Sequence, residues 1–256
     1  GLESWIAALR KPEVKEPDHP LFVWAHFIDG EVDPVATVFD RHYEGIRRRL
    51  AERHKQNSES VKGAVKFADF TEKSFADAGW FTTGESFGSA PSGTGQWAHV
   101  NGDVAVAGRA HGARLAGQLQ GVLRSPTFEI SHNQIHHLVS ARKGGLQIRL
   151  IIDSYVMEPY NGLLFGGTRI NDPNTDGKPK WLSQGRDLKM YRGHKAHLEY
   201  IDHGNGHFEV DEIWFSDGRA PTTAPSATAL KIAGNDKIHS IKGLAIAYGW
   251  LWKHSS

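Results

Sequence analysis

The chain has 256 residues, a formal net charge of +1 and no cysteine. That length fits one large domain, or one domain with additions. Without cysteine the chain has no disulfide, no cysteine-ligated zinc, no thiol catalysis and no haem attached through cysteine. The balanced charge offers no broad basic field for nucleic acid, and no apolar run is long enough for membrane insertion.

Residues 1–60 are predicted to be a helical flanking region. Apolar residues recur at helical spacing within 4–9, within 20–27 and, most regularly, within 33–55. Three consecutive arginines, 47–49, lie on the later turns of the longest segment, where they favour a solvated helix end over a nucleic-acid site.

Residues 61–220 show the pattern of an all-β domain. Short stretches of alternating or apolar residues are separated by Gly, Asn, Asp and Pro, which predicts an antiparallel β-sandwich. The expected strands lie within residues 65–70, 97–100, 104–107, 121–130, 135–141, 146–155, 162–165 and 180–183.

Residues 221–256 are predicted to hold a linker and a C-terminal helix. The composition from 218 to 228 is rich in Gly, Pro, Thr, Ser and Ala, and helical spacing returns from 238 to 254. The predicted fold class is therefore mainly β, with short helical segments at both termini.

The stretch 186–217 carries the first functional signal. It reads as two strands joined by a polar turn at 202–206, with Asp202 ending the first strand and Asp211 inside the second. Carboxylates are depleted in strands. A hairpin would bring these two together, so we expect a cation or a hydroxyl-rich ligand between them.

Arg149 lies within a strongly apolar strand pattern, where a charge is costly unless it is paired. Two interpretations stay open and are compatible. One is a structural salt bridge with Asp202 or Asp211. The other is an arginine–carboxylate pair that holds vicinal hydroxyls of a sugar.

Asp69 lies near the start of the sandwich region, and Asp211 lies near its end. If the first and last strands are neighbours, Asp69 and Asp211 could share a structural Ca²⁺ ion, which prefers oxygen ligands. The alternative is that Asp69 caps a turn.

Aromatic side chains could supply stacking platforms for a sugar, although a core position is the ordinary alternative for each. Trp181 and Tyr160 lie next to loops and are the preferred candidates, with Tyr191 from the 186–217 stretch. His136 and His137 should point to opposite faces of one strand and so cannot ligate one ion together. His203 and His207 are expected at the polar surface.

Several motifs together resemble a known family. They are Gly79-Trp80 with Gly84-x-x-Phe87-Gly88, Ser125-Pro126-x-Phe128, Ile148-Arg149-Leu150, Tyr191-x-Gly193 and Val210-Asp211-Glu212-Ile213. The pattern resembles the lectin-like domain of planctomycete proteins that carry a cytochrome c domain and PSD1-type helical regions. It is distantly similar to the levan-binding family 66 carbohydrate-binding modules, although the turn 204–208 lacks their tryptophan.

The resemblance implies a concanavalin-like or jelly-roll sandwich that binds glycans without catalysis. It also implies an exported parent protein, hence an extracytoplasmic location and other parent domains as partners. The parent's haem motif is not in this chain.

The leading hypothesis is a non-catalytic polysaccharide-binding module. The polar contacts with the sugar would come from Arg149, Asp202 and Asp211. The stacking contact would come from Tyr191, Trp181 or Tyr160. One alternative is a lyase or glycosidase that uses a carboxylate pair from Asp202, Asp211 or Glu212, although Asp211 and Glu212 should face opposite sides. The other is a structural or protein-interaction module.

Overall fold

The computed structural model describes residues 2–28, 36–93, 96–98, 103–104, 107–112, 115–142, 144–155, 168–185 and 188–253. The chain divides into two compact units. A helical unit combines Gly1–Lys62 with Thr222–Ser256, and a sandwich unit spans Gly63–Pro221. The sequence had placed these boundaries after residues 60 and 220.

The helical unit joins both flanks of the chain in one hydrophobic core, supplied chiefly by α2, α3, α5 and α6. The sequence patterns had treated the two flanks as separate regions. The helices are α1 (Leu2–Leu9), η1 (Pro12–Lys15), α2 (Phe22–Ile28), α3 (Ala36–Ser60), α5 (Ala227–Ala233) and α6 (Ile241–Lys253).

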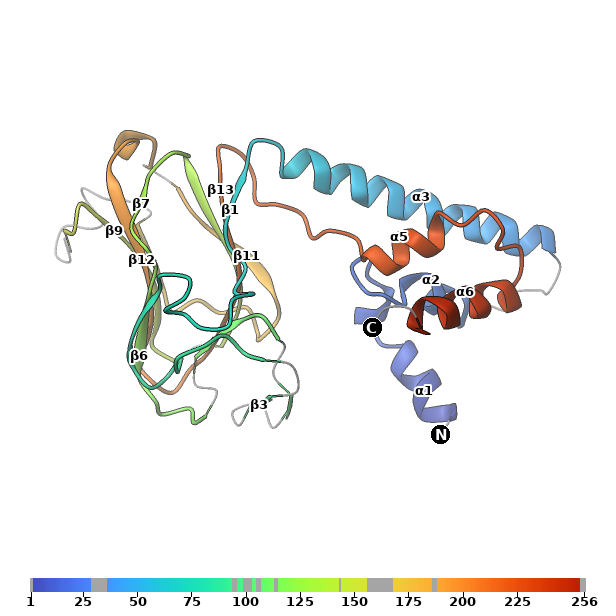
Figure 1. Cartoon of the computed structure of the whole chain (residues 1–256), viewed down its shortest axis with the longest axis horizontal. Helices are drawn as coiled ribbons and strands as arrows, with labels where there is room; N and C mark the ends of the chain where they lie inside the picture. The colour runs from blue at the N-terminus through green and yellow to red at the C-terminus, as the bar shows by residue number, and fades with distance from the viewer. Residues whose placement is uncertain are drawn as a thin grey trace. The chain divides into compact units, whose positions relative to one another are not determined.

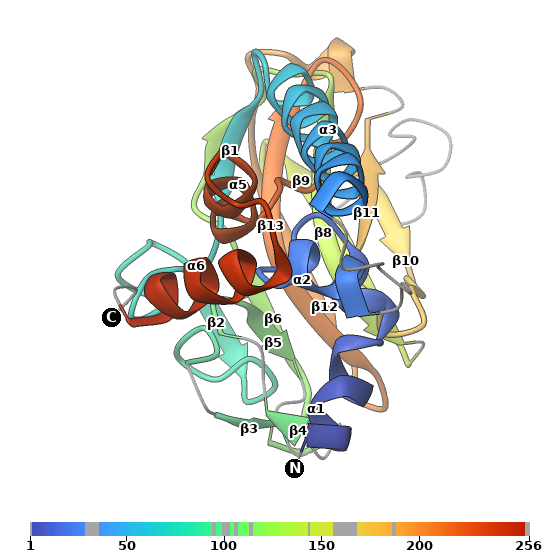
Figure 2. The same ribbon diagram turned by 90° about the vertical axis from the view of Figure 1, so that its right-hand side faces the viewer.

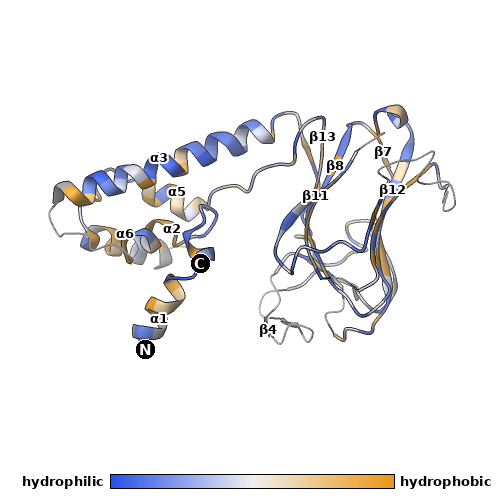
Figure 3. Cartoon of the chain, turned by 180° about the vertical axis from the view of Figure 1, so that it is seen from behind, coloured by the Kyte–Doolittle hydropathy of each residue, from blue (hydrophilic) through white to orange (hydrophobic). Residues whose placement is uncertain are grey.

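Helix α3 shows why the flanks associate. Phe39, Tyr43, Ile46 and Leu50 follow helical spacing and are buried, whereas most of the helix is hydrophilic (Figure 3). The Tyr43 hydroxyl donates a hydrogen bond of 2.6 Å to the Ile232 carbonyl in α5. An amphipathic helix from one flank is therefore stabilised by the other.

The sandwich unit contains two antiparallel sheets that face each other (Figure 1), and a separate two-stranded sheet of β3 and β4. Sheet A has the order β1–β13–β8–β11, with β5 also paired to β13, and Figure 2 shows the four strands of that path side by side. Sheet B has the order β10–β9–β12–β6–β2, with β7 also paired to β12. The predicted mainly-β antiparallel sandwich is confirmed.

The strands are short and match most of the predicted stretches, although 121–130 is divided at its proline and 162–165 lies outside the described residues. They are β1 (Val65–Ala68), β2 (Phe81–Gly84), β3 (Trp97–Ala98), β4 (Asp103–Val104), β5 (Ala110–Gly112), β6 (Gly121–Arg124), β7 (Phe128–Glu129), β8 (Gln134–Arg142), β9 (Leu146–Ile152), β10 (Arg169–Asn171), β11 (Lys180–Gln184), β12 (Lys195–Asp202) and β13 (His207–Ser216). A 3₁₀ turn, η3 (Leu188–Tyr191), precedes β12.

Alternation along the strands fills the space between the sheets. In β12, Leu198 and Tyr200 are fully buried and face inward, so Glu199 faces the outer side of sheet B. In β13, Val210 and Ile213 are both fully buried, although an odd number of steps separates them. A β-bulge between Val210 and Glu212 accounts for this spacing.

Buried polar contacts of His137 join the two sheets. His137 of β8 lies 2.7 Å from the Tyr200 hydroxyl of β12 and 2.9 Å from Gln184 Oε1. Burial lowers the pKa of His137 to about 3, against a smaller opposing effect of Gln184. His136 faces the other way, between the hydroxyls of Ser183 and Ser216, as the alternation predicts.

The predicted hairpin at 202–206 is wrong, although both of its strands exist. β12 belongs to sheet B and β13 to sheet A, so the turn carries the chain from one sheet to the other. At this crossing Asp202 is buried and accepts hydrogen bonds of 2.6 Å from the Ser86 hydroxyl and 2.9 Å from the Gly204 amide. It also lies close to Gly112, because a Cβ atom added to Gly112 would be 3.0 Å from Asp202 Oδ2. Asp202 therefore fixes the crossover.

In the part of the chain that the structure describes, no helix is both long and apolar enough to cross a membrane.

Candidate functional site

The outer face of sheet B carries a row of four charged residues and one phenylalanine that runs across five strands. In the strand register Arg149 of β9 stands between Arg169 of β10 and Glu199 of β12. Glu199 in turn stands opposite Arg124 of β6, which stands opposite Phe81 of β2. Residues opposite each other share a face of the sheet, so these five form one row, here called the arginine row.

The arginine row is accessible to solvent. Arg124 and Phe81 are exposed, and Arg149, Arg169 and Glu199 are half-buried. Phe81 is 63% exposed, which is unusual for a phenylalanine in a strand. Four strand spacings give the row a length of about 19 Å.

Neighbouring side chains orient the centre of the row. Arg149 Nε donates a 2.9 Å hydrogen bond to Gln147 Oε1. His197 Nε2 lies 3.5 Å from Glu199 Oε1, and its Nδ1 lies 3.5 Å from Arg124 Nη2. Burial and then the Arg124 charge lower the pKa of His197, against the opposing effect of Glu199. Near neutral pH the ring is thus uncharged and stands between a guanidinium and a carboxylate.

This arrangement has the chemistry of a polar ligand site. Guanidinium groups donate paired hydrogen bonds, the carboxylate accepts them, and the amide of Gln147 does both. Phe81 offers an exposed ring at one end for an apolar surface. Together these groups can hold a hydroxyl-rich chain along the row.

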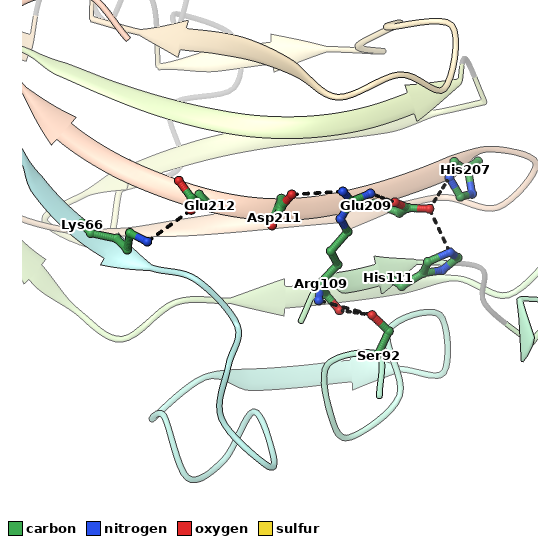
Figure 4. Close-up of polar contacts among 8 residues, drawn as sticks. All are labelled: Lys66, Ser92, Arg109, His111, His207, Glu209, Asp211 and Glu212. Atoms are coloured by element: carbon green, nitrogen blue, oxygen red, sulfur yellow. Dashed lines mark hydrogen bonds and ion pairs between the residues drawn. The ribbon is translucent and has the colours of Figure 1, made fainter. Parts of the chain in front are cut away.

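The outer face of sheet A carries a second polar cluster, which is mostly buried (Figure 4). Arg109 Nη1 donates to Glu209 Oε2 at 2.6 Å, and Arg109 Nη2 lies 3.1 Å from Asp211 Oδ2. Arg109 thus joins two carboxylates of β13. Burial raises the pKa of Asp211, and the Arg109 charge opposes that rise.

Two histidines complete this cluster around Glu209. His207 Nε2 and His111 Nε2 lie 3.0 Å and 3.2 Å from the same oxygen, Glu209 Oε1. The three residues are buried, with 4%, 1% and 6% of their surface exposed for His207, His111 and Glu209. Burial alone would raise the pKa of Glu209, but the contacts with both histidines and Arg109 outweigh it, and the pKa lies well below its ordinary value.

His111 is the exceptional member of the cluster. Its 3.2 Å contact with Glu209 lacks hydrogen-bond geometry, and within the part of the chain that the structure describes neither ring nitrogen of this buried histidine makes a hydrogen bond. Nδ1 of His207 is likewise buried without one. Such buried polar atoms are rare in native structures and call for a specific explanation.

The carboxylates proposed for calcium lie on this same side of the sandwich, because β1 pairs with β13 as expected. Protein cations already contact them. Lys66 Nζ lies 3.7 Å from Asp69 Oδ2 and 3.2 Å from Glu212 Oε1, and Arg109 contacts Asp211. A calcium ion at Asp69 and Asp211 stays a prediction.

The bulge in β13 corrects one expectation about these carboxylates. Strict alternation would put Asp211 and Glu212 on opposite faces. Because Val210 and Ile213 both face inward, Asp211 and Glu212 both lie on the outer side, where they meet Arg109 and Lys66.

The predicted ligand residues do not form one site. Arg149 lies on the outer face of sheet B, Asp211 on that of sheet A, and Asp202 is buried at the crossover. The expected pairing of Arg149 with either carboxylate is therefore wrong, because the hairpin on which it depended does not form.

The aromatic candidates are also dispersed. Trp181 lies in β11 opposite Leu138 of β8, and both are half-buried on the outer side of sheet A. Tyr191 is half-buried, packs against the sandwich core and meets the His194 ring edge-on at 5.9 Å. Tyr160 lies outside the described residues.

The buried cluster was missed from the sequence, although a signal for it exists. Arg109 and His111 are two residues apart, as are His207 and Glu209, and residues two apart in extended chain point to the same side. No strand was predicted over 110–112, and His207 was assigned to the surface.

Comparison with known proteins gives no match to a family model and none to a curated protein. Among solved structures, the K1 cleaved adhesin domain of Lys-gingipain from Porphyromonas gingivalis is 12% identical, with a TM-score of 0.38, covering 61% of this chain and 99% of that domain. The K2 cleaved adhesin domain of Lys-gingipain is also 12% identical, with a TM-score of 0.39 and coverage of 61% and 99%.

A third similar structure is TmCBM61 in complex with β-1,4-galactotriose, at 12% identity and a TM-score of 0.33, covering 59% of this chain and 99% of that one. The matches therefore span about three-fifths of this chain.

Proposed function

We propose that the sandwich unit is a non-catalytic carbohydrate-binding module and that its ligand lies along the arginine row. The observation that carries this proposal is the alignment of Arg149, Glu199, Arg124 and Phe81 on one accessible face. Charged and amide groups beside an exposed ring are the combination that recognises a sugar's hydroxyls and its apolar surface.

The alternative of a polysaccharide-cleaving enzyme has less support from these residues. Its carboxylate pair was to come from Asp202, Asp211 or Glu212. Asp202 is buried in hydrogen bonds at the sheet crossing, and Arg109 and Lys66 neutralise the other two. Glycosidases need one carboxyl group as acid and another as base or nucleophile at one scissile bond, which this distribution does not provide.

The remaining expectations extend the same proposal. Resemblance to the lectin-like domain of the planctomycete PSD1 and cytochrome c proteins supports an exported parent, an extracytoplasmic location and contacts with other parent domains. A structural Ca²⁺ ion bound by Asp69 and Asp211 is a further expectation that extends the proposal. Thermal unfolding with calcium and with a chelator tests that ion, since specific binding raises the transition temperature.

A polysaccharide panel tests the main proposal. We expect the full chain to be retarded in native gels that contain a recognised polysaccharide, and Arg149→Ala to migrate as in a gel without it. Arg192→Ala is the matched control, because Arg192 is exposed and pairs with Asp217 away from the row. Failure to bind any member of a broad neutral and acidic panel would contradict the proposal. Release of soluble sugars would favour the enzyme.

A further inference from the structure

We propose that His111, His207 and Glu209 form a binding site for a divalent transition-metal ion, with Zn²⁺ as the representative ion. Each residue offers one potential ligand atom, and these atoms all lie within 4.8 Å of one another. Two imidazoles and a carboxylate are a ligand set that zinc accepts. Ca²⁺ prefers oxygen ligands and does not match this set.

The spacing of the ligand atoms supports a shared ion. Ligands about 2.0–2.2 Å from zinc are themselves roughly 2.9–3.4 Å apart in tetrahedral or octahedral arrangements. The two distances from Glu209 Oε1, 3.0 Å to His207 Nε2 and 3.2 Å to His111 Nε2, fall in that interval.

The hydrogen bonding of the His111 ring nitrogens distinguishes a metal site from a cluster held by hydrogen bonds alone. In a pure hydrogen-bond cluster, each Nε2–H would point at Oε1. Among the described residues, His111 is 1% exposed and neither of its ring nitrogens makes a hydrogen bond, although Nε2 lies 3.2 Å from Glu209 Oε1. Leaving a buried polar group unsatisfied costs about 1–3 kcal/mol. An ion between the three side chains would give His111 Nε2 its missing partner.

Surrounding residues already hold the carboxylate in a position to bind an ion. Arg109 occupies Oε2 of Glu209 at 2.6 Å, which leaves Oε1 on the side of the histidines. Asp211 holds Arg109 in turn at 3.1 Å. The register of β13 against β5 places Glu209 directly opposite His111. Such outer partners orient ligands in known metal sites.

Calorimetric titration of the chelator-treated full chain with Zn²⁺, without a polyhistidine tag, tests the proposal. We expect one ion per chain, with affinity at least tenfold lower in His207→Gln and Glu209→Gln. The control His194→Gln removes an exposed histidine that pairs with Asp153, and it should bind as the wild type does. Unchanged affinity in both cluster variants, or no saturable binding by the wild type, would overturn the proposal.

A measurement on the unmodified chain covers the case in which the variants fail to fold. Crystals soaked in Zn²⁺ and measured at the zinc absorption edge should show the anomalous peak between His111, His207 and Glu209. A peak only at exposed histidines, or none, would overturn the proposal. Neither experiment depends on glycan binding.

Discussion

The two outer faces of the sandwich hold similar residue types under opposite conditions. On sheet B, Arg124 and Phe81 are exposed and the other members of the row are half-buried. On sheet A, His111, His207 and Glu209 are almost completely buried. A charge near solvent can exchange water for a ligand at small cost, whereas a buried charge must keep its partners. This difference in exposure fits the proposals of ligand binding on the first face and of stability or metal binding on the second.

The largest difference between the faces should appear when Glu209 is removed. Glu209→Ala leaves Arg109, His111 and His207 buried without the carboxylate that all three contact, and loss of one partner of a buried ion pair costs about 3–5 kcal/mol. The free energy of unfolding in urea measures this cost. Glu199→Ala, on the accessible face, should cost less than about 1 kcal/mol. Equal losses in the two variants would remove the distinction between the faces.

Acid should weaken the core that lies between the two faces. The pKa of His137 is about 3 in the folded protein, against 6.5 for an ordinary histidine, so folding favours the neutral ring. Stability from this group is complete above pH 6.5 and falls as the pH drops towards 3. Between pH 7.5 and 5 we expect a loss of about 2 kcal/mol.

The variant His137→Gln isolates this contribution. Burial also lowers the pKa of His136 and His197, so they contribute to pH dependence with the same sign. The slope of unfolding free energy against pH should therefore be reduced in the variant without vanishing. An unchanged slope would show that His137 is not held neutral by the fold.

A substitution of Phe81 tests whether the accessible face of sheet B contacts the ligand. Phe81→Ala removes a ring that is 63% exposed, so unfolding should be little affected. Glycan affinity should fall several-fold, since an aromatic contact of this kind contributes about 0.5–1.5 kcal/mol. Isothermal titration with the polysaccharide that the wild type recognises measures it. Lost stability with unchanged affinity would make Phe81 a packing residue.

The smallest expected effect concerns Lys66 on the other face. Lys66 is partly exposed, and surface ion pairs contribute about 0–1 kcal/mol, so Lys66→Ala should unfold almost as the wild type does. Removing the ammonium frees Asp69 and Glu212 for a cation. Calcium should then raise the transition temperature of the variant more than that of the wild type, as calorimetry can show. An equal rise in the transition temperature of both proteins would show that calcium does not bind at Asp69 and Glu212.

The sequence predicted the sheet strands because their alternation is local. In β12 the inward-facing Leu198 and Tyr200 alternate with the outward-facing Glu199, and the helical spacing of α3 is equally plain. Strand pairing is not local. A polar turn such as 203–206 has the same composition whether it closes a hairpin or crosses between sheets, so the position of Asp202 was misjudged.

The same limit explains the errors at the candidate sites. The bulge at Asp211 shifts the alternation by one residue without any mark in the sequence. The arginine row combines residues from five separate strands, and the sequence pattern singles out only Arg149 among these residues. His111 and His207 meet through the pairing of β5 with β13, which depends on the whole sandwich.

The most direct test compares one residue from each face for the same ligand. Arg149 belongs to the arginine row, and Trp181 lies on the outer side of sheet A. Binding of the recognised polysaccharide should weaken at least tenfold in Arg149→Ala, which corresponds to about 1.4 kcal/mol. It should be unchanged in Trp181→Ala. Binding that survives Arg149→Ala but is lost in Trp181→Ala would contradict the account and move the ligand to the opposite face.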